Sequence, residues 1–170
     1  ELYLRDGSKG NDLWELLWEA GQDFNISAGG PNIILRLEGG ILSYLADIDR
    51  SNNPYEVGLD WLVDLDQEDD FIGKEALRLI RQNGPTKKLL GAEIHGDPIE
   101  DSNADHWPVF IDGKEVGSMN AMVYSPRLDK NICYTILDIE HAKSGQEIVI
   151  VSPEKDLIAT TVDLPWRERA

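Results

Sequence analysis

The second half of the chain constrains the fold most, because short apolar segments alternate there with turn residues. Six segments of strand-like composition follow one another from residue 87 onward. Asp112 and Gly113 separate two of them, and both residue types tolerate the positive φ of a two-residue hairpin turn. Short strands separated by turns are typical of a small antiparallel barrel. We expect strands at residues 89–95, 108–111, 115–124, 132–137, 147–151 and 158–164.

The first half mixes helical and strand patterns. Asn11 is predicted to cap a helix that Gly21 ends, and Pro31 is predicted to open a second helix that weakens at Gly39 and Gly40. Strict alternation of apolar residues predicts a half-buried strand over 57–65, and residues 2–4 read as the end of another strand. A third helix is expected from residue 73 to residue 83. The sequence therefore predicts an α+β chain with an α+β region at 1–84 and a β-barrel domain at 85–170.

Charge and composition narrow the functional classes. The 170 residues include 32 acidic and 16 basic side chains, for a net charge of −16. This balance disfavours nucleic acids and anionic membranes as partners, because both are recognised through clustered Lys and Arg. The apolar runs are only a few residues long, whereas a membrane-spanning helix needs roughly 20. Cys133 has no second cysteine to pair with, and a cytoplasmic location is expected.

An acidic segment before the third helix leaves two readings open. Asp64, Asp66, Glu68 and Glu75 stand at positions one, three, five and twelve of a calcium loop, but Asp69 occupies the position that needs glycine. The alternative is a solvated loop whose carboxylates favour the start of the helix. The histidines and Cys133 lack metal-ligand spacing. We predict no metal ligand and no catalytic residue within this chain.

Two tryptophans stand four residues apart in the first predicted helix. Trp14 and Trp18 are placed on neighbouring turns, so their rings share one side of the helix. They are either a binding surface or packing at a domain boundary.

Several segments, in order along nearly the whole chain, resemble the glycine-cleavage T-protein (aminomethyltransferase) family. The segment 70–77, D-F-I-G-K-E-A-L, is similar to a family segment without departure. The amino-acid sequence at 30–32, 42–44 and 53–56 is closer to the branch of dimethylsulfoniopropionate demethylases. The other segments that carry the resemblance are L-R-L-E-G-G at 35–40, D-I-D at 47–49, G-L-D-W at 58–61, K-L-L-G at 88–91, S-P at 125–126, K-N-I at 130–132 and L-P-W at 164–166.

The resemblance implies a fold and a cofactor. Family enzymes hold tetrahydrofolate in a channel between three domains, and the last domain is a Greek-key β-barrel. The resemblance covers the back half of such an enzyme, so the N-terminal region of the same protein becomes an expected partner. Asn32, Glu38 and Tyr44 are the expected folate-binding residues, and Asn32 stands where T-proteins carry an arginine. For Glu38 and Tyr44, the alternative is that they only tie the second helix to the segment after it.

We consider three functional hypotheses, of which the first two follow from the resemblance. The first is the C-terminal fragment of a tetrahydrofolate-dependent one-carbon transferase, which passes a methyl or aminomethyl group from a small-molecule donor and is inactive as a fragment. The second is a non-enzymatic folate-binding or scaffold protein of the same fold. The third is a stand-alone interaction module.

Overall fold

The computed structural model describes residues 2–30, 32–102 and 105–166. The chain forms two compact units, residues 1–31 and residues 32–170, and we describe each by itself. No helix among the described residues has the length and apolar character needed to cross a bilayer.

The first unit is one amphipathic helix with a short turn of 3-10 helix at each end. The helix α1 (Gly10–Gly21) lies between η1 (Gly7–Lys9) and η2 (Gln22–Phe24). Asp6 accepts hydrogen bonds from the Ser8 backbone at 3.0 Å and from the Ser8 hydroxyl at 2.7 Å, which starts the first turn. Asn11 was the predicted cap, and that prediction is wrong: Lys9 is at the N-cap position, because the preceding turn of η1 lets α1 begin at Gly10.

The second unit begins with short helices and turns. Its elements before the barrel are α2 (Ile33–Glu38), η3 (Asp60–Leu62) and α3 (Lys74–Asn83). The helix α2 ends at Glu38 because Gly39 closes the last turn and Gly40 follows with φ of +68°. Pro31, the predicted first residue of this helix, lies outside the described residues. The third helix starts at Lys74, one residue after its predicted start.

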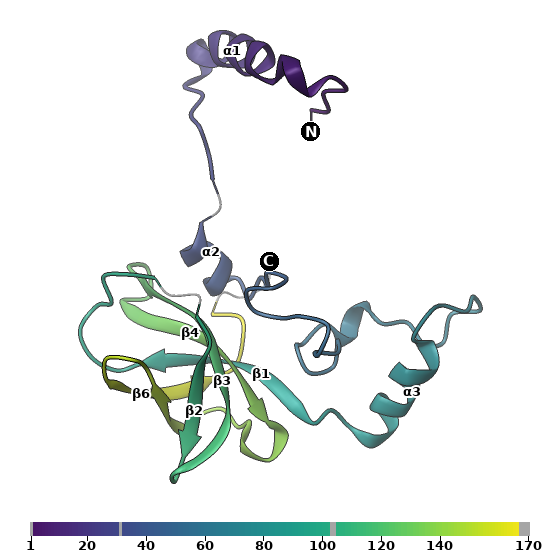
Figure 1. The fold of residues 1–170 in the computed structure, drawn as a ribbon, viewed down its shortest axis with the longest axis vertical. Helices are drawn as coiled ribbons and strands as arrows, with labels where there is room; N and C mark the ends of the chain where they lie inside the picture. Colours follow the sequence, from purple (N-terminus) through teal and green to yellow (C-terminus); the bar gives the residue numbers. More distant parts are fainter. Residues whose placement is uncertain (1, 31, 103–104, 167–170) are drawn as a thin grey trace. The chain divides into compact units, whose positions relative to one another are not determined.

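The barrel is the larger part of the second unit (Figure 1). Six antiparallel strands close in the order β1-β4-β3-β2-β5-β6. The strands β2, β3 and β4 form a meander. The last of them, β4, lies beside β1, the first strand of the barrel, which is a Greek-key arrangement. The predicted α+β chain with a small antiparallel barrel is thereby confirmed. The strands are β1 (Lys87–Ile94), β2 (Trp107–Ile111), β3 (Lys114–Ser125), β4 (Lys130–Asp138), β5 (Glu147–Val151) and β6 (Asp156–Val162).

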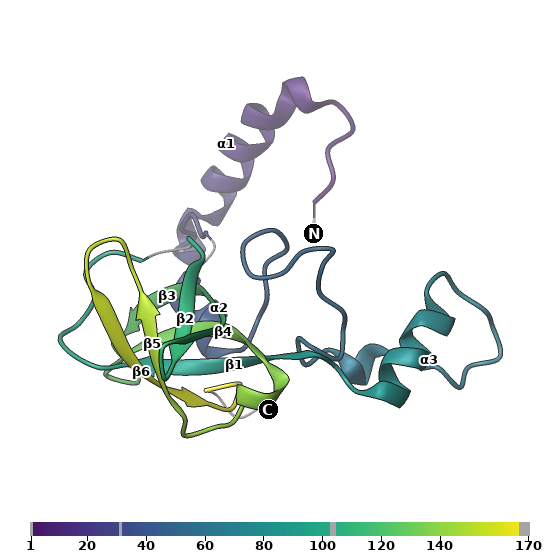
Figure 2. The same ribbon diagram turned by 60° about the horizontal axis from the view of Figure 1, so that its bottom comes forward.

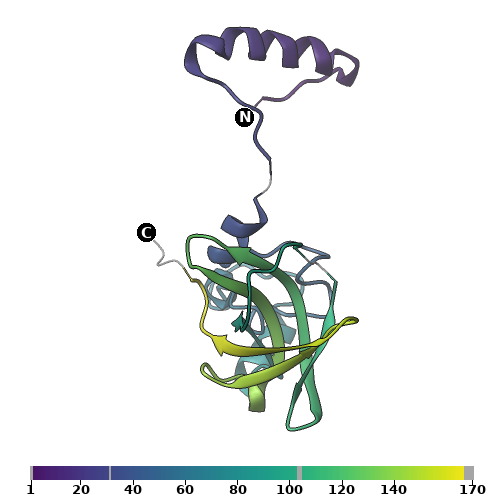
Figure 3. The same ribbon diagram turned by 90° about the vertical axis from the view of Figure 1, so that its left-hand side faces the viewer.

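Two details explain how the strands turn and close. Asp112 has φ of +50° and Gly113 has φ of +77°, the pair of positive values that a tight hairpin needs, as predicted. Gly117 lies on β3 opposite β4, and a Cβ there would stand 2.1 Å from the Ile136 carbonyl oxygen. Glycine thus permits the close approach of β3 and β4, whose strands wrap around the barrel as Figures 2 and 3 show.

Buried apolar side chains form two clusters. One fills the barrel interior, with Leu90, Val109, Met119 and Ile150 among its fully buried members. The other lies between α2 and the outer face of β3 and β4, where Leu37 packs against Ala121, Val123, Ile132 and Tyr134. The second cluster fixes α2 on the barrel and places the segment that follows α2.

Two strand predictions in the first half are wrong. Residues 57–65 form turns and the 3-10 helix η3, because Gly58 adopts φ of +70° and the backbone groups bond locally. Leu62 N–H donates to Leu59 and Val63 N–H donates to Asp60. Residues 2–4 are not in a strand, because they have no regular secondary structure. Alternating apolar residues gave the same pattern as a strand without its backbone pairing.

Candidate functional site

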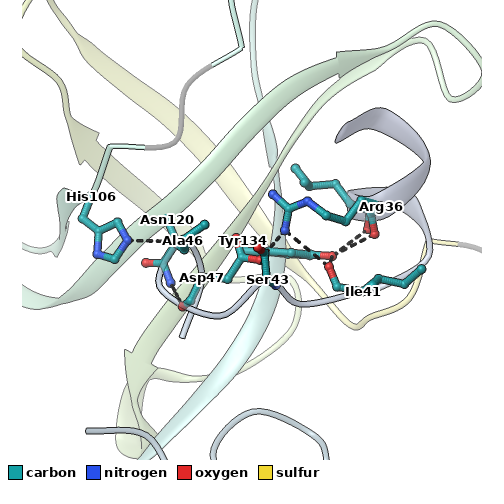
Figure 4. Close-up of polar contacts among 9 residues, drawn as sticks. Arg36, Ile41, Ser43, Ala46, Asp47, His106, Asn120 and Tyr134 are labelled. Atoms are coloured by element: carbon teal, nitrogen blue, oxygen red, sulfur yellow. Dashed lines mark hydrogen bonds and ion pairs between the residues drawn. The ribbon is translucent and has the colours of Figure 1, made fainter. Parts of the chain in front are cut away.

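A buried ion pair organises the segment after α2 (Figure 4). Arg36, in the last turn of α2, pairs through Nη1 with Oδ2 of Asp47, whose side chain is completely buried. The same carboxylate oxygen accepts the Ser43 backbone N–H at 2.6 Å. The Asp47 N–H in turn donates to the Ser43 carbonyl at 2.9 Å. Residues 41–47 are therefore closed into a loop around one carboxylate.

The barrel and the segment before β2 hold this loop from the other side. The Asn120 side-chain amide, buried in the irregular part of β3, donates to the Asp47 carbonyl at 2.6 Å. His106 Nε2 lies 2.8 Å from the Ala46 carbonyl, which can only accept, so Nε2 carries the proton. Both contacts go to backbone oxygens. They fix the path of the loop rather than any one of its side chains.

Tyr134 joins β4 to the end of α2. Its hydroxyl lies within 3.1–3.3 Å of the carbonyl oxygens of Arg36, Leu37 and Ile41, and it donates toward them. Burial raises the pKa of Tyr134 and the Asp47 carboxylate raises it further, whereas Arg36 lowers it. The hydroxyl stays protonated at neutral pH, so Tyr134 is a structural donor and not a base.

A polar cavity of about 280 Å³ lies between this loop and the outer face of the barrel. Asp47 of the loop and Asp49 just after it line one side of the cavity, and the barrel contributes Ser118 and Asn120. Hydrogen bonds from Ser51 lower the pKa of Asp49, and the charge of His106 adds to this effect. Asp49 is therefore a fixed negative charge at the cavity. A second cavity of about 780 Å³ lies at the end of the barrel between residues 94–102 and 152–157.

Asn32, one of the three predicted folate-binding residues, caps α2. Its Oδ1 accepts the Leu35 N–H at 3.1 Å, and its backbone carbonyl accepts the Arg36 N–H. The side chain thus satisfies a donor that the helix start would leave unpaired. Asn32 and Arg36 belong to the same helix, so the cap also positions the ion pair.

Glu38, the second predicted residue, is the buried last residue of α2, and its side chain meets the end of β3 and the turn from β3 to β4. Ser125 donates its hydroxyl to Oε1 at 2.5 Å, and Arg127 Nε donates to Oε2 at 2.8 Å. The Ser125 hydroxyl also accepts the Leu128 N–H at 3.2 Å. Glu38 therefore ties α2 to the barrel.

Tyr44, the third predicted residue, lies on the loop with 57% of its surface exposed. It follows Ser43, whose backbone binds Asp47. The structure thus brings Tyr44 and Glu38 to the two ends of one short segment. Asn32 stands at the opposite end of α2.

Sequence reasoning did not single out the network residues. Arg36 and Asp47 belong to the segments that carried the resemblance, and a charged pair flanking two glycines was the available signal. Asn120, His106, Arg127 and Tyr134 gave no such signal, because their partners are far away in the sequence and are mostly backbone carbonyls.

The acidic segment before α3 is organised around a lysine. Lys74 is buried, and its Nζ donates to the carbonyls of Gln67 at 2.7 Å and Asp69 at 2.9 Å. Asp64 accepts N–H groups from Asp66 and Gln67. Two carbonyls of the loop, at positions four and six of the calcium-loop numbering, are thus bound to an ammonium group. Within the described residues, no three His, Cys, Asp or Glu side chains converge to hold a metal ion.

Two family profiles match this chain. The profile described as "GCVT N-terminal domain" matches residues 1–67, and the profile described as "Glycine cleavage T-protein C-terminal barrel domain" matches residues 87–166. The chain belongs to the glycine-cleavage T-protein family. The second match coincides with the six strands of the barrel, so the family's barrel domain and the observed one are the same element.

The relatives include both branches named by the resemblance. A dimethylsulfoniopropionate demethylase from Ruegeria pomeroyi is 34% identical over 98% of this chain and 45% of its own length. An aminomethyltransferase from Herpetosiphon aurantiacus is 36% identical over 95% of this chain and 47% of its own length. This T-protein-family chain spans about half the length of the curated relatives it matches.

A solved structure supports the fold. The glycine cleavage system aminomethyltransferase T from Bartonella henselae superimposes with a TM-score of 0.70 at 21% identity, covering 79% of this chain and 37% of that protein. At this identity the similarity speaks for the fold alone.

Proposed function

We propose that this chain is the C-terminal part of a tetrahydrofolate-dependent one-carbon transferase. The observation that carries the proposal is the ordered match of both family profiles, together with relatives that are named demethylase and aminomethyltransferase. The donor is a small molecule that carries a methyl or aminomethyl group. The intact protein is the enzyme, in the cytoplasm, and the chain alone is inactive.

The residues around the loop support a folate role in different ways. Tyr44 is the exposed aromatic ring on the loop, and such a ring can stack on a flat heterocycle. Asn32 and Glu38 act at the two ends of α2, where their side chains bond to the helix start and to the barrel turn. We propose that Tyr44 contacts the folate directly and that Asn32 and Glu38 place it. Folate, when bound, supplies the nitrogen that accepts the one-carbon unit.

The chain's own contribution is positioning. The Arg36–Asp47 pair and the Asn120 contact hold residues 41–47 in one path before any ligand arrives. Preorganisation of this kind lowers the entropic cost of bringing two reactants together. For a sulfonium donor, folate held at Tyr44 would supply the nitrogen that accepts the methyl carbon as the carbon–sulfur bond breaks, and that nitrogen would release its proton. No described residue of this chain needs to form a covalent bond in that transfer.

Binding of tetrahydrofolate tests the cofactor part. Under anaerobic conditions, calorimetry on the intact protein should show saturable binding, and Tyr44→Ala should weaken it at least tenfold without lowering the melting temperature. Tyr55→Ala offers a control on a neighbouring half-buried tyrosine outside the proposed site. Absence of saturable binding to the intact protein would overturn the proposal.

One observation favours a second candidate, a folate-binding or scaffold protein without transferase activity. Asn32 stands where the family resemblance places an arginine, and its side chain serves the helix cap. A capping amide cannot form the bidentate pair with a carboxylate that an arginine forms. Folate binding without transfer from any sulfonium or aminomethyl donor would identify this second candidate.

A further inference from the structure

The helix α1 carries an apolar side that no other described residue of its own unit buries. None of its residues is buried, and Trp14, Leu16, Leu17 and Trp18 are 37–63% exposed. An amphipathic helix normally hides such a stripe against a core. Single exposed apolar residues scattered over a surface are normal in proteins. Four large exposed apolar side chains within twelve residues instead form one continuous apolar surface, which indicates an interaction site.

The two sides of α1 are sharply separated. At about 100° per residue, Leu13, Leu16, Leu17, Ala20 and the two tryptophans share one side, with Leu17 at its centre. The acidic residues Asp12, Glu15 and Glu19 are spaced three and four apart and share the opposite side. The helix is therefore built with one face for water and one for a partner.

Local structure holds this apolar side in a defined form. Trp14 and Trp18 stack with ring centroids 6.1 Å apart and an interplanar angle of 15°. The chain turns back directly after the helix, where the Ile26 N–H donates to the Gly21 carbonyl at 3.1 Å. A Cβ on Gly21 would stand 2.6 Å from Ile26, so glycine is needed for this turn.

The charge of α1 and the family membership of the chain limit which class of partner fits this apolar side. The helix Gly10–Gly21 has no basic residue, whereas helices that lie on membranes are rich in Lys and Arg. Residues 1–67 match a domain profile, and the relatives extend over more than twice the matched length. A helix that belongs to part of a domain has the rest of that domain as its natural cover.

We infer that the apolar side of α1 docks onto the part of the GCVT N-terminal domain that the longer relatives carry outside their match to this chain. The inference rests on the proposed function, in which this chain is the C-terminal part of a longer protein, and it assigns the surface that binds the rest of that protein. The contact is apolar, centred on Leu17, and flanked by the stacked pair of Trp14 and Trp18.

Fluorine NMR on the chain labelled with 5-fluorotryptophan tests this directly. The probe is the unmatched part of the Ruegeria pomeroyi demethylase, produced as a separate polypeptide. Its addition should shift the Trp14 and Trp18 resonances, assigned by Trp→Phe variants, and leave those of the barrel tryptophans Trp107 and Trp166 in place. Leu17→Ser should weaken binding at least tenfold, whereas Glu15→Ser, on the opposite side of the same helix, should leave it unchanged.

If the separate polypeptide does not fold, the same two variants are compared in a single chain that joins it to residues 1–170. Leu17→Ser should then lower the unfolding midpoint in urea more than Glu15→Ser does. Equal effects of the two variants would overturn the inference. Two further results would overturn it. Trp14 and Trp18 resonances that already report burial in the chain alone would mean docking on residues 32–170. Resonances that change with the concentration of the chain would mean docking on a second copy. No folate is present, so loss of transferase activity with docking intact would count against the proposed function only.

Discussion

Arg36 and Asp47 form an ion pair in which the Asp47 side chain is entirely buried and the Arg36 side chain is 20% exposed. Asp47 Oδ2 receives both the guanidinium and the Ser43 N–H, while no described partner bonds to Oδ1. The ion pair therefore joins α2 to the base of the loop that carries Tyr44. Its loss would release that loop as well as lower stability.

Removing the arginine should expose this dependence. Arg36→Met leaves a buried carboxylate without its counter-ion, which costs about 3–5 kcal/mol. Urea unfolding followed by circular dichroism measures the change. Arg81→Met breaks the exposed pair with Asp66, where the charged atoms are 3.7 Å apart, and should cost less than about 1 kcal/mol. Similar losses for both variants would show that Asp47 is not dependent on Arg36.

Tyr134 should make the free energy of unfolding decrease at alkaline pH. Its pKa is raised above the ordinary value of 10.0, chiefly by burial. The folded state then holds this proton more tightly than the unfolded state, so the contribution is fully present below pH 10 and is lost as the pH rises above it. Unfolding free energies between pH 8 and pH 11 should fall less steeply for Tyr134→Phe than for the natural protein. Tyr44→Phe, on the exposed loop, should keep the steep fall, and a parallel course for Tyr134→Phe would contradict the assignment.

Gly117 should tolerate no side chain. An alanine Cβ would stand 2.1 Å from the Ile136 carbonyl oxygen and 2.9 Å from the Leu137 Cα, both in the backbone of β4. The strands must separate, and Gly117→Ala should destabilise the barrel by about 3 kcal/mol or more. Gly29→Ala, where no atom lies within 4 Å of the new Cβ, should stay within about 0.5 kcal/mol. Thermal unfolding of the two variants compares them, and a stable Gly117→Ala barrel would mean that β3 and β4 lie farther apart than described.

The acidic loop before α3 should depend on Lys74 and not on calcium. Lys74→Met leaves the Gln67 and Asp69 carbonyls without their donor, which should cost about 1–3 kcal/mol. Millimolar calcium chloride should leave the melting temperature of the natural protein unchanged. A calcium-dependent rise that EDTA reverses would show that the loop binds the ion despite the lysine.

The barrel could be predicted from the sequence because its signals are local. Asp112 and Gly113 specify a hairpin by their own backbone preferences, and residues 147–151 form a short run rich in β-branched residues whose strand bounds were predicted to the residue. Residues 57–65 show the alternation of apolar residues that is typical of a strand, yet Gly58 turns the chain and the segment is in no strand of the described structure. Periodicity shows which residues are apolar but does not show where their backbone groups bond.

The site was less accessible to sequence reasoning. Asn32, Glu38 and Tyr44 came from the resemblance, and their folate role stays a prediction. Glu38 meets Ser125 and Arg127 across 87 and 89 residues of sequence, and Asn120 meets Asp47 across 73. Contacts of this range depend on how α2 packs on the barrel, which no local pattern contains.

Methyl transfer to tetrahydrofolate by the intact protein tests the central claim most directly. The intact protein would be incubated anaerobically with tetrahydrofolate and dimethylsulfoniopropionate carrying ¹³C methyl groups, and in parallel with an aminomethyl donor. Mass spectrometry of the folate would detect the labelled carbon. A transferase requires labelled folate from one of these donors, at a rate that Tyr44→Ala lowers. Folate that stays unlabelled with every donor, while the protein is folded and binds it, would contradict the transferase assignment.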